Sequence, residues 1–434
     1  MKRLSFLFLT VIFASCPFAQ LYVPIDTANL PIRTQAEKDY MRFSKAYIKS
    51  LRNDYKAGEI YFLKNKFQDI DKVVKEDILR GQFVFDSRFD KIINEIVTII
   101  VDKNKILPSD LKFYVSRNAS LNAYSLGNKC FVINMGTFYF LRNEDQLASV
   151  ISHEIGHFVL KHSIQDKLND YAFNKSSDLR DDVSNIKKEK YNKGDKAYNK
   201  LKEILYQNGK LSKKQVFEAD SIGYVLYRNT KYNKYDYLTS LRLMEIYDTI
   251  RPIGVKIDTY RNLFNLPNLP FNEAWLKKED FSGYDYSKYK DRYNEDSISS
   301  HPEIDIRIAN LRRIFPDIEK EETPQASVQF LDLQKLAQNE LTYCFQFNEE
   351  YGFGVYLCLL YLQEKPTDQF YINRLGSFMD KIYKARKEYT LNRYLERMDP
   401  KNQSESYQQF LSFMWNLNPK ELKIFADYYT KKGS

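Results

Sequence analysis

Apolar positions follow a helical period through the first part of the chain. Between residues 36 and 105 they recur about every three or four residues, with Phe43, Tyr47 and Leu51 in one stretch and Ile92 and Ile96 in another. This spacing places apolar side chains on one face of each helix. We therefore expect packing helices here, with no evident chemistry of their own.

The pattern changes between residues 108 and 134. Short runs rich in aromatic and β-branched residues, 111–115 and 131–133, are typical of strands, and the stretch 122–127 separates them. These runs predict a small β-sheet. Two roles stay open, because the sheet either offers an edge on which a peptide lies extended or serves only as core.

An amphipathic helix is expected over residues 143–162. Asn143 is a good N-cap, Gln146 completes a capping-box-like pair, and acidic residues in the first turn suit the helix dipole. The apolar face consists of Leu147, Val150, Ile151 and Phe158. The local pattern therefore predicts a helix independently of any chemistry.

Charged and irregular segments follow. Residues 163–214 hold few apolar positions, which predicts either a mobile excursion over the cleft or a solvated helical hairpin. Another helix is expected to begin at Ser212 as its cap and to carry Glu218 and Asp220. Residues 252–300 are rich in tyrosine and interrupted by proline and glycine, so a long irregular segment with short helices is expected.

Helical spacing returns from about residue 327 to the end. Pro366 and Pro400 are 34 residues apart, and the pair Leu375-Gly376 falls where a tetratricopeptide repeat places its Leu-Gly pair. Only this one repeat matches, so a degenerate tetratricopeptide-like array and a plain helical bundle both stay open. The whole pattern predicts a mainly α fold with a small β-sheet, followed by a C-terminal α-helical domain over residues 323–434.

The first twenty residues differ from the rest of the chain. Lys2 and Arg3 precede the apolar run 4–14, and small residues follow before a polar one. This order predicts a signal peptide over residues 1–19, cleaved after Ala19, and therefore export to the periplasm or cell envelope. In a rival interpretation Cys16 is the lipidated first residue of a lipoprotein.

Composition narrows the function classes. The net charge is +9, but Lys and Arg are interleaved with Asp and Glu, which argues against nucleic acid as a partner. After the leader no stretch of apolar residues is long enough to span a bilayer, so no transmembrane span is expected in the mature chain. Cys130, Cys344 and Cys358 are expected to be buried, with a Cys344–Cys358 bridge as the alternative.

The candidate chemistry lies on the helix over residues 143–162. His153 and His157 are four residues apart, so their imidazoles share a helix face and can bind one metal ion. Glu154 would then lie beside a metal-bound water as general base. An isolated histidine is more often an ordinary residue, but the chain has only 4 histidines. The other two, His162 and His301, lie on this helix and in a second motif.

The second motif stands at the start of a later helix. Pro302 suits a helix start, and Arg307 falls within the next two turns. A histidine such as His301, held there near a metal, can stabilise the oxyanion of a tetrahedral intermediate. Carboxylates from the helix of Glu218 and Asp220 would complete a site with three protein ligands and one water.

The chain resembles the zinc endopeptidases of the CAAX prenyl protease and HtpX-like family over about residues 75–313. The matching blocks keep the family's order and spacing: Asn122-Ala123-Tyr124, Gly136, His153-Glu154-Ile155-Gly156-His157 with His162, Glu218-Ala219-Asp220, and His301-Pro302 with Arg307. The mature chain is similar to the soluble periplasmic branch typified by BepA and LoiP.

This resemblance implies a zincin-like metallopeptidase domain within residues 20–322. It implies one Zn²⁺ per chain on His153 and His157, Glu154 as base, and proteolysis of envelope proteins. It also implies that the helical tail recruits substrates or a partner protein.

One position departs from the family pattern. The family's third zinc ligand is a glutamate one turn before Asp220, and this chain has Val216 there. Glu218 is rotated by roughly 200° from Asp220 on a helix, so it reaches the metal only through a local distortion. Three outcomes stay open: Glu218 coordinates in this way, Asp220 coordinates instead of supporting His153, or the site is poor in metal.

Two functional hypotheses follow from these outcomes. The first is a secreted zinc metalloendopeptidase of envelope protein quality control. The second is a degenerate protease, weakly catalytic or non-catalytic, that binds proteins through its cleft and tail as a chaperone-like module.

Overall fold

The computed structural model describes residues 22–25, 28–188, 193–248, 254–278, 303–318, 322–399 and 403–433. Three predictions lie outside the described residues: the signal peptide, lipidation at Cys16, and the motif His301-Pro302.

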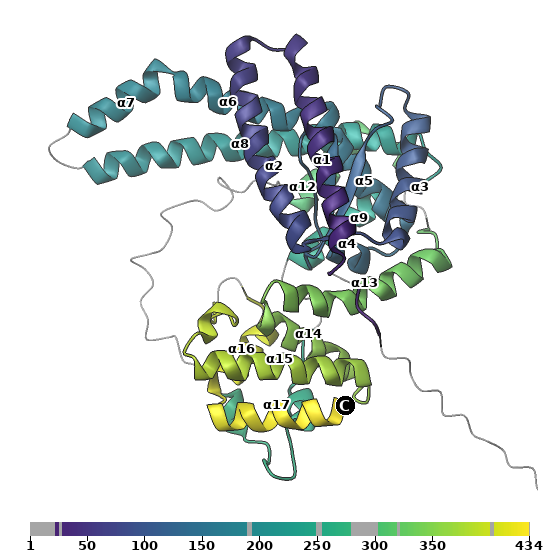
Figure 1. The fold of residues 1–434 in the computed structure, drawn as a ribbon, viewed down its shortest axis with the longest axis vertical. Coiled ribbons are helices and arrows are strands. Elements are labelled where there is room, and N and C mark those ends of the chain that lie inside the picture. Colours follow the sequence, from purple (N-terminus) through teal and green to yellow (C-terminus); the bar gives the residue numbers. More distant parts are fainter. Residues whose placement is uncertain are drawn as a thin grey trace, which may run out of the picture.

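The described chain runs from a helical hairpin through a small sheet into two sets of helices (Figure 1). The N-terminal elements are α1 (Leu30–Ser50), η1 (Leu51–Asn53), α2 (Ala57–Arg80), β1 (Phe83–Val84), α3 (Ser87–Lys103), β2 (Lys112–Ser116), β3 (Ala123–Ser125), β4 (Cys130–Asn134) and α4 (Met135–Phe140). The middle elements are α5 (Glu144–Val159), α6 (His162–Lys175), α7 (Ser177–Lys188), α8 (Lys193–Arg228), α9 (Asp236–Asp248), α10 (Ile257–Leu263), η2 (Glu273–Leu276) and α12 (Ile304–Ile314). The C-terminal elements are α13 (Val328–Phe347), α14 (Tyr351–Glu364), α15 (Gln369–Lys387), η4 (Leu391–Arg393), α16 (Glu405–Asn416) and α17 (Pro419–Gly433).

The sheet has four strands in the order β1-β2-β4-β3. β2 and β4 are parallel, with Val115 opposite Ile133, and the two outer strands pair antiparallel. The predicted strands are confirmed as β2 and β4. The stretch 122–127, expected only as a connection, contains β3. This strand is three residues long, so its pairing with β4 defines it better than its own sequence pattern does.

The helix α5 begins at the predicted N-cap Asn143, whereas the Gln146 side chain accepts a hydrogen bond from the backbone N–H of Arg142 at 2.8 Å and not from that of Asn143. The Asn143 side chain accepts a hydrogen bond from the backbone N–H of Gln146 at 2.9 Å, and most of the helix is buried. Another detail of the prediction is wrong, because His162 is not on this helix. α5 ends at Val159, Lys161 takes a left-handed conformation (φ 55°), and His162 opens α6 in a new direction.

The charged stretch 163–214 forms helices, so the helical hairpin is the alternative that the structure supports. In Figure 1, α7 and α8 extend together from the body of the molecule. The predicted helix start at Ser212 is wrong, since α8 already begins at Lys193. No proline interrupts residues 193–228, so nothing in the backbone forces a break at Ser212.

The C-terminal helices continue the hydrophobic core of the preceding part. One buried cluster runs from Val84 through α5 to Tyr429 in α17. At the Leu375-Gly376 pair, a Cβ on Gly376 would lie 2.7 Å from the backbone nitrogen of Thr430, so this glycine permits close packing of α15 on α17. The predicted boundary at residue 322 stays a prediction.

The cysteines of the described ranges are buried and unpaired, as expected. Cys130, Cys344 and Cys358 are free and buried, so the alternative bridge is absent among them. Within the described ranges, no helix combines the length and apolar character that a membrane crossing requires.

Candidate metal centre

Two imidazoles on α5 face one another. The Nε2 atoms of His153 and His157 lie 3.2 Å apart. Two nitrogen ligands at 2.0–2.1 Å from one tetrahedral zinc ion would be separated by about 3.4 Å. The pair therefore fits two corners of a zinc site. Among the described residues, no group of three or more His, Cys, Asp and Glu side chains is arranged to hold a metal.

A close crossing of α5 and α8 brings the second helix to the histidines. A Cβ on Gly156 would lie 2.8 Å from the carbonyl oxygen of Ala219, and one on Gly223 would lie 2.9 Å from the Cα of His153. Only glycine leaves space for these backbones to approach so closely. The crossing places Asp220 directly behind His153.

Asp220 and Arg307 support His153 from behind. Asp220 Oδ1 lies 2.9 Å from His153 Nδ1, although the ring N–H does not point along this line. Arg307 donates two hydrogen bonds to the same carboxylate, at 2.7 and 2.8 Å, and both side chains are buried. Burial alone would raise the pKa of Asp220, but the guanidinium outweighs burial and holds that pKa well below its ordinary value. An ionised carboxylate therefore faces His153.

A second chain of contacts supports His157. Its Nδ1 lies 3.0 Å from Nδ1 of His162, and Nε2 of His162 lies 3.2 Å from Glu218 Oε2. The left-handed turn at Lys161 makes this possible, because it directs His162 back toward α5. Burial, reinforced by the two neighbouring histidines, lowers the pKa of His157 well below its ordinary value. The ring is therefore neutral at pH 7, which is the form that ligates metals.

Glu154 lies between the helix and the sheet. The backbone N–H of Ser125 in β3 approaches its carboxylate and acts to lower the pKa of Glu154. Burial raises the pKa of Glu154 to about 7, against the lowering effects of His153 and Arg307, while the side chain keeps a partly exposed surface. A carboxyl group with a pKa near neutrality can both accept and return a proton.

The other predicted residues occupy distinct places. Val216 is buried in α8, and Glu218 contacts His162 instead of the facing Nε2 atoms. Asn122 is held through its backbone: its carbonyl oxygen accepts a hydrogen bond from the Thr137 hydroxyl at 2.8 Å. His301 lies outside the described residues.

Sequence reasoning did not anticipate three contacts of this site. These are the Ser125 N–H on Glu154, the His162–Glu218 contact, and the Tyr237 hydroxyl on the carbonyl oxygen of Asp220 at 3.1 Å. The position of His162, five residues after His157, was the available signal for the second of them.

The helix pair with its histidines and carboxylates has the parts of a metallopeptidase centre. The model of peptidase family M48 matches residues 87–315, just over half of the 434-residue chain. The chain therefore belongs to peptidase family M48, which implies metallopeptidase activity and is typically zinc-dependent. Helices α13 to α17 follow this domain. A comparison with curated proteins found no match.

Proposed function

We propose that the chain is a zinc-dependent endopeptidase in which His153 and His157 ligate the metal and Glu154 is the general base. The observation that carries this proposal is the 3.2 Å separation of the two Nε2 atoms on the helix that also bears Glu154. When bound, zinc would polarise the scissile carbonyl and acidify a water molecule. Glu154 would take the proton of that water and return it to the leaving amine.

The neighbouring groups orient the ligands. Asp220, fixed by Arg307, lies 2.9 Å from Nδ1 of His153, and Glu218 contacts His157 through His162. Such partners fix the orientation of a ligating imidazole and raise its basicity. We assign oxyanion stabilisation to His301 on the sequence motif alone.

The substrate would lie along β3. This strand is at one edge of the sheet, and its Ser125 N–H approaches Glu154. Tyr124 in the same strand is 40% exposed. An extended peptide that pairs with β3 would therefore pass directly in front of the base, with main-chain hydrogen bonds supplying affinity.

Metal content and cleavage test the proposal together. We expect one zinc per chain, loss of zinc in His153→Ala, and retained zinc in Glu154→Gln. Cleavage of an unfolded protein such as casein should fall at least about 100-fold in Glu154→Gln, because general-base catalysis is lost. Glu95→Gln, an exposed change on α3, is the matched control. Unchanged cleavage by Glu154→Gln would refute the assignment of the base.

A degenerate, protein-binding role is the second candidate. It is favoured by Val216 at the position of the family's third ligand and by Glu218, which would have to leave His162 to reach the metal. The third ligand is therefore Glu218 after such a movement, Asp220 in place of its supporting role, or no protein group. A zinc-free protein that binds unfolded clients without cleaving them would establish this second role.

The finer assignment follows the sequence. We place the protein in the soluble, BepA/LoiP-like branch of the HtpX-like peptidases, exported to the periplasm or cell envelope, where it would degrade envelope proteins. The leader pattern of residues 1–19 supports export. The helices α13 to α17 would recruit substrates or a partner, as a degenerate tetratricopeptide-like array or as a plain bundle. Fractionation of the native host, with a soluble periplasmic marker, tests the location.

A further inference from the structure

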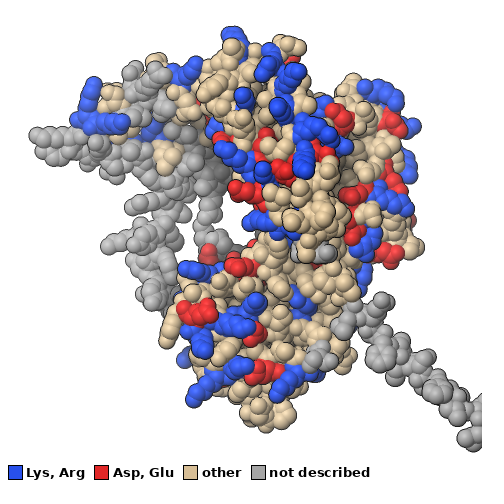
Figure 2. Space-filling model, viewed as in Figure 1, with Lys and Arg blue, Asp and Glu red and all other residues tan. Residues whose placement is uncertain are grey.

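A groove with a volume of about 750 Å³ lies between α1 and α2. We call it the α1–α2 basic groove. Five of its lining residues are cationic: Arg42, Lys45, Lys49, Arg52 and Lys64. Three lie on α1, and Arg52 lies on the following η1. The four recur at intervals of three or four residues, so they form one row over roughly 15 Å. Figure 2 shows Lys and Arg side chains in blue over this part of the molecule.

Most of this charge is uncompensated within the described part of the chain. Arg42 pairs with Asp39 at 2.6 Å, whereas Lys45, Lys49, Arg52 and Lys64 have no carboxylate in ion-pair contact among the described residues. The acidic side chain in the lining, Asp71, is buried and accepts hydrogen bonds from Tyr40 and Ser44. The groove therefore presents a positive field to solvent.

The groove is also amphipathic. Met41, Ile48 and Ile60 contribute partly buried apolar surface between the cations. Tyr61, which is outside the lining, is 70% exposed and lies one turn before Lys64. A cationic row beside apolar and aromatic side chains matches the interface of an anionic membrane, where phosphates meet acyl chains.

We propose that the α1–α2 basic groove binds the surface of an anionic phospholipid membrane. The chemistry favours this occupant over an extended acidic peptide, because the backbone N–H and C=O groups of each helix are already hydrogen-bonded within that helix. The groove thus offers charge and apolar contact without a free row of main-chain donors. The groove shares no lining residue with the histidine cluster, so the proposal is independent of catalysis.

The hairpin of α1 and α2 packs directly on the peptidase domain. Leu63 and Phe67 on α2 pack with Ile164 of α6, the helix that begins at His162. A membrane that engages the groove would therefore fix the orientation of the catalytic domain relative to the lipid surface.

Vesicle co-sedimentation of the purified mature chain tests the proposal. Vesicles of phosphatidylcholine mixed with phosphatidylglycerol should bind the chain, binding should fall with salt, and pure phosphatidylcholine should bind far less. Lys45→Glu/Lys49→Glu should lower the partition coefficient by roughly tenfold or more. Both lysines are exposed, so the fold should tolerate the change.

Matched variants distinguish the effect of the groove on vesicle binding from the effect of the chain's net charge. Lys91→Glu/Lys420→Glu alters the chain's charge by the same amount at exposed sites outside the groove and should bind like the unmodified chain. Glu154→Gln should also bind normally. Equal loss in the two double variants, or no preference for anionic vesicles, would overturn the proposal. Groove-dependent binding of glycerol phosphate or poly-glutamate without vesicle binding would overturn it as well.

Discussion

Two buried arginine–carboxylate pairs hold this molecule together in different ways. Arg307 and Asp220 lie behind the histidines, and Arg117 and Glu340 lie between the sheet and α13. All four side chains are at most 4% exposed. Removing such charges from water is unfavourable, and only good geometry with further hydrogen bonds offsets that cost.

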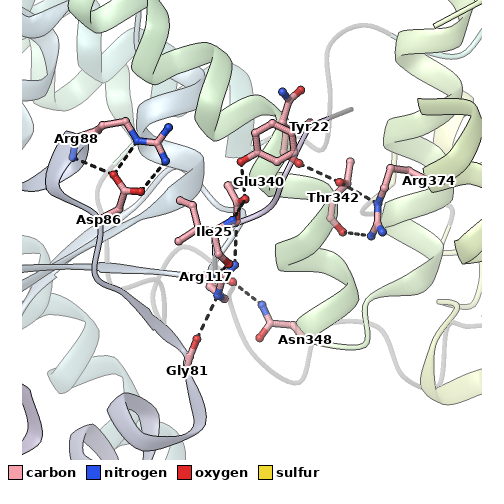
Figure 3. A network of polar contacts seen from close by, with 11 residues as sticks. Tyr22, Ile25, Gly81, Asp86, Arg88, Arg117, Glu340, Thr342, Asn348 and Arg374 are labelled. Atoms are coloured by element: carbon pink, nitrogen blue, oxygen red, sulfur yellow. Dashed lines mark hydrogen bonds and ion pairs between the residues drawn. The ribbon is translucent and has the colours of Figure 1, made fainter. Parts of the chain in front are cut away.

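The side-chain hydrogen bonds of Arg117 and Glu340 link separate parts of the fold. Arg117 donates hydrogen bonds to Glu340, at 3.0 Å, and to the carbonyl oxygens of Gly81 and Ile25 (Figure 3). Glu340 accepts hydrogen bonds from the Tyr22 hydroxyl at 2.5 Å and the Ile25 N–H at 2.8 Å. The pair thus joins the N-terminal segment, the β-sheet region and the C-terminal helices.

Asp220 instead has one carboxylate oxygen that also lies near a residue outside the pair, His153. Its carboxylate takes both hydrogen bonds from Arg307, and Oδ1 still lies 2.9 Å from the His153 ring. The same kind of buried arginine–carboxylate pair therefore joins distant segments in one place and faces a candidate ligand in the other. Stability alone cannot tell these roles apart.

Removing the arginine of either pair should cause the largest loss in the free energy of unfolding. Arg117→Met and Arg307→Met should each lower the free energy of unfolding by about 3–5 kcal/mol, because a buried carboxylate loses its partner. Urea denaturation of the full chain measures this loss. Arg42→Met, an exposed change, is the control. A loss below about 1 kcal/mol would show that the carboxylate is protonated or reaches solvent.

Replacing both members of each pair should separate the two roles. Arg117→Met/Glu340→Leu and Asp220→Leu/Arg307→Met should each regain much of the lost stability, since no charge stays buried alone. Only the second double variant should lower zinc affinity, by roughly 10–100-fold, because His153 loses its orienting group. Competition with a zinc-binding dye measures this affinity. Equal zinc affinity in the two double variants would remove the distinction between the pairs.

The N-terminal contact of Glu340 predicts a smaller effect. Tyr22→Phe should lower the free energy of unfolding by about 1.5 kcal/mol, because a hydrogen bond to a buried charged group is lost. Amide hydrogen exchange should also accelerate at Ile25, whose N–H shares the same carboxylate oxygen. Tyr61→Phe is the matched control, since that ring is exposed. Unchanged exchange at Ile25 would mean that this segment docks independently of Tyr22.

Local features of the site could be predicted from the sequence. The Asn143 cap depends on neighbouring residues alone, and the four-residue spacing of His153 and His157 fixes their shared face whatever the helix packs against. The family-level assignment rested on such local blocks, and the match to peptidase family M48 supports it.

Contacts between distant segments could not be predicted in the same way. The contact of Glu218 with His162 depends on the left-handed turn at Lys161, and lysine carries no strong signal for that conformation. Arg117 and Glu340 are 223 residues apart, and nothing near either residue identifies its partner. Tertiary packing decides such pairs, whereas hydrophobic periodicity decides only which face of each helix is buried.

The smallest expected change in stability concerns Asp145, a carboxylate whose partner is a backbone N–H and not an arginine. It accepts a hydrogen bond from the N–H of Asn233 at 2.8 Å. Burial raises the pKa of Asp145 from 3.8 to about 6, despite that hydrogen bond, whereas Arg307 lowers the pKa of Asp220. Because the folded-state pKa is raised, this group's contribution to stability is complete below about pH 4 and is lost as the pH rises through about 6.

Asp145→Asn should remove this pH dependence, because the amide keeps the acceptor oxygen but cannot ionise. The side chain is partly exposed, so solvent screening limits the expected gain in the free energy of unfolding to about 1 kcal/mol at pH 7.5, with no gain at pH 4. Urea denaturation at the two pH values measures the difference. An equal effect at both would mean that Asp145 titrates as it does in the unfolded chain, and that a partly buried carboxylate without a bonded arginine is tolerated here without loss.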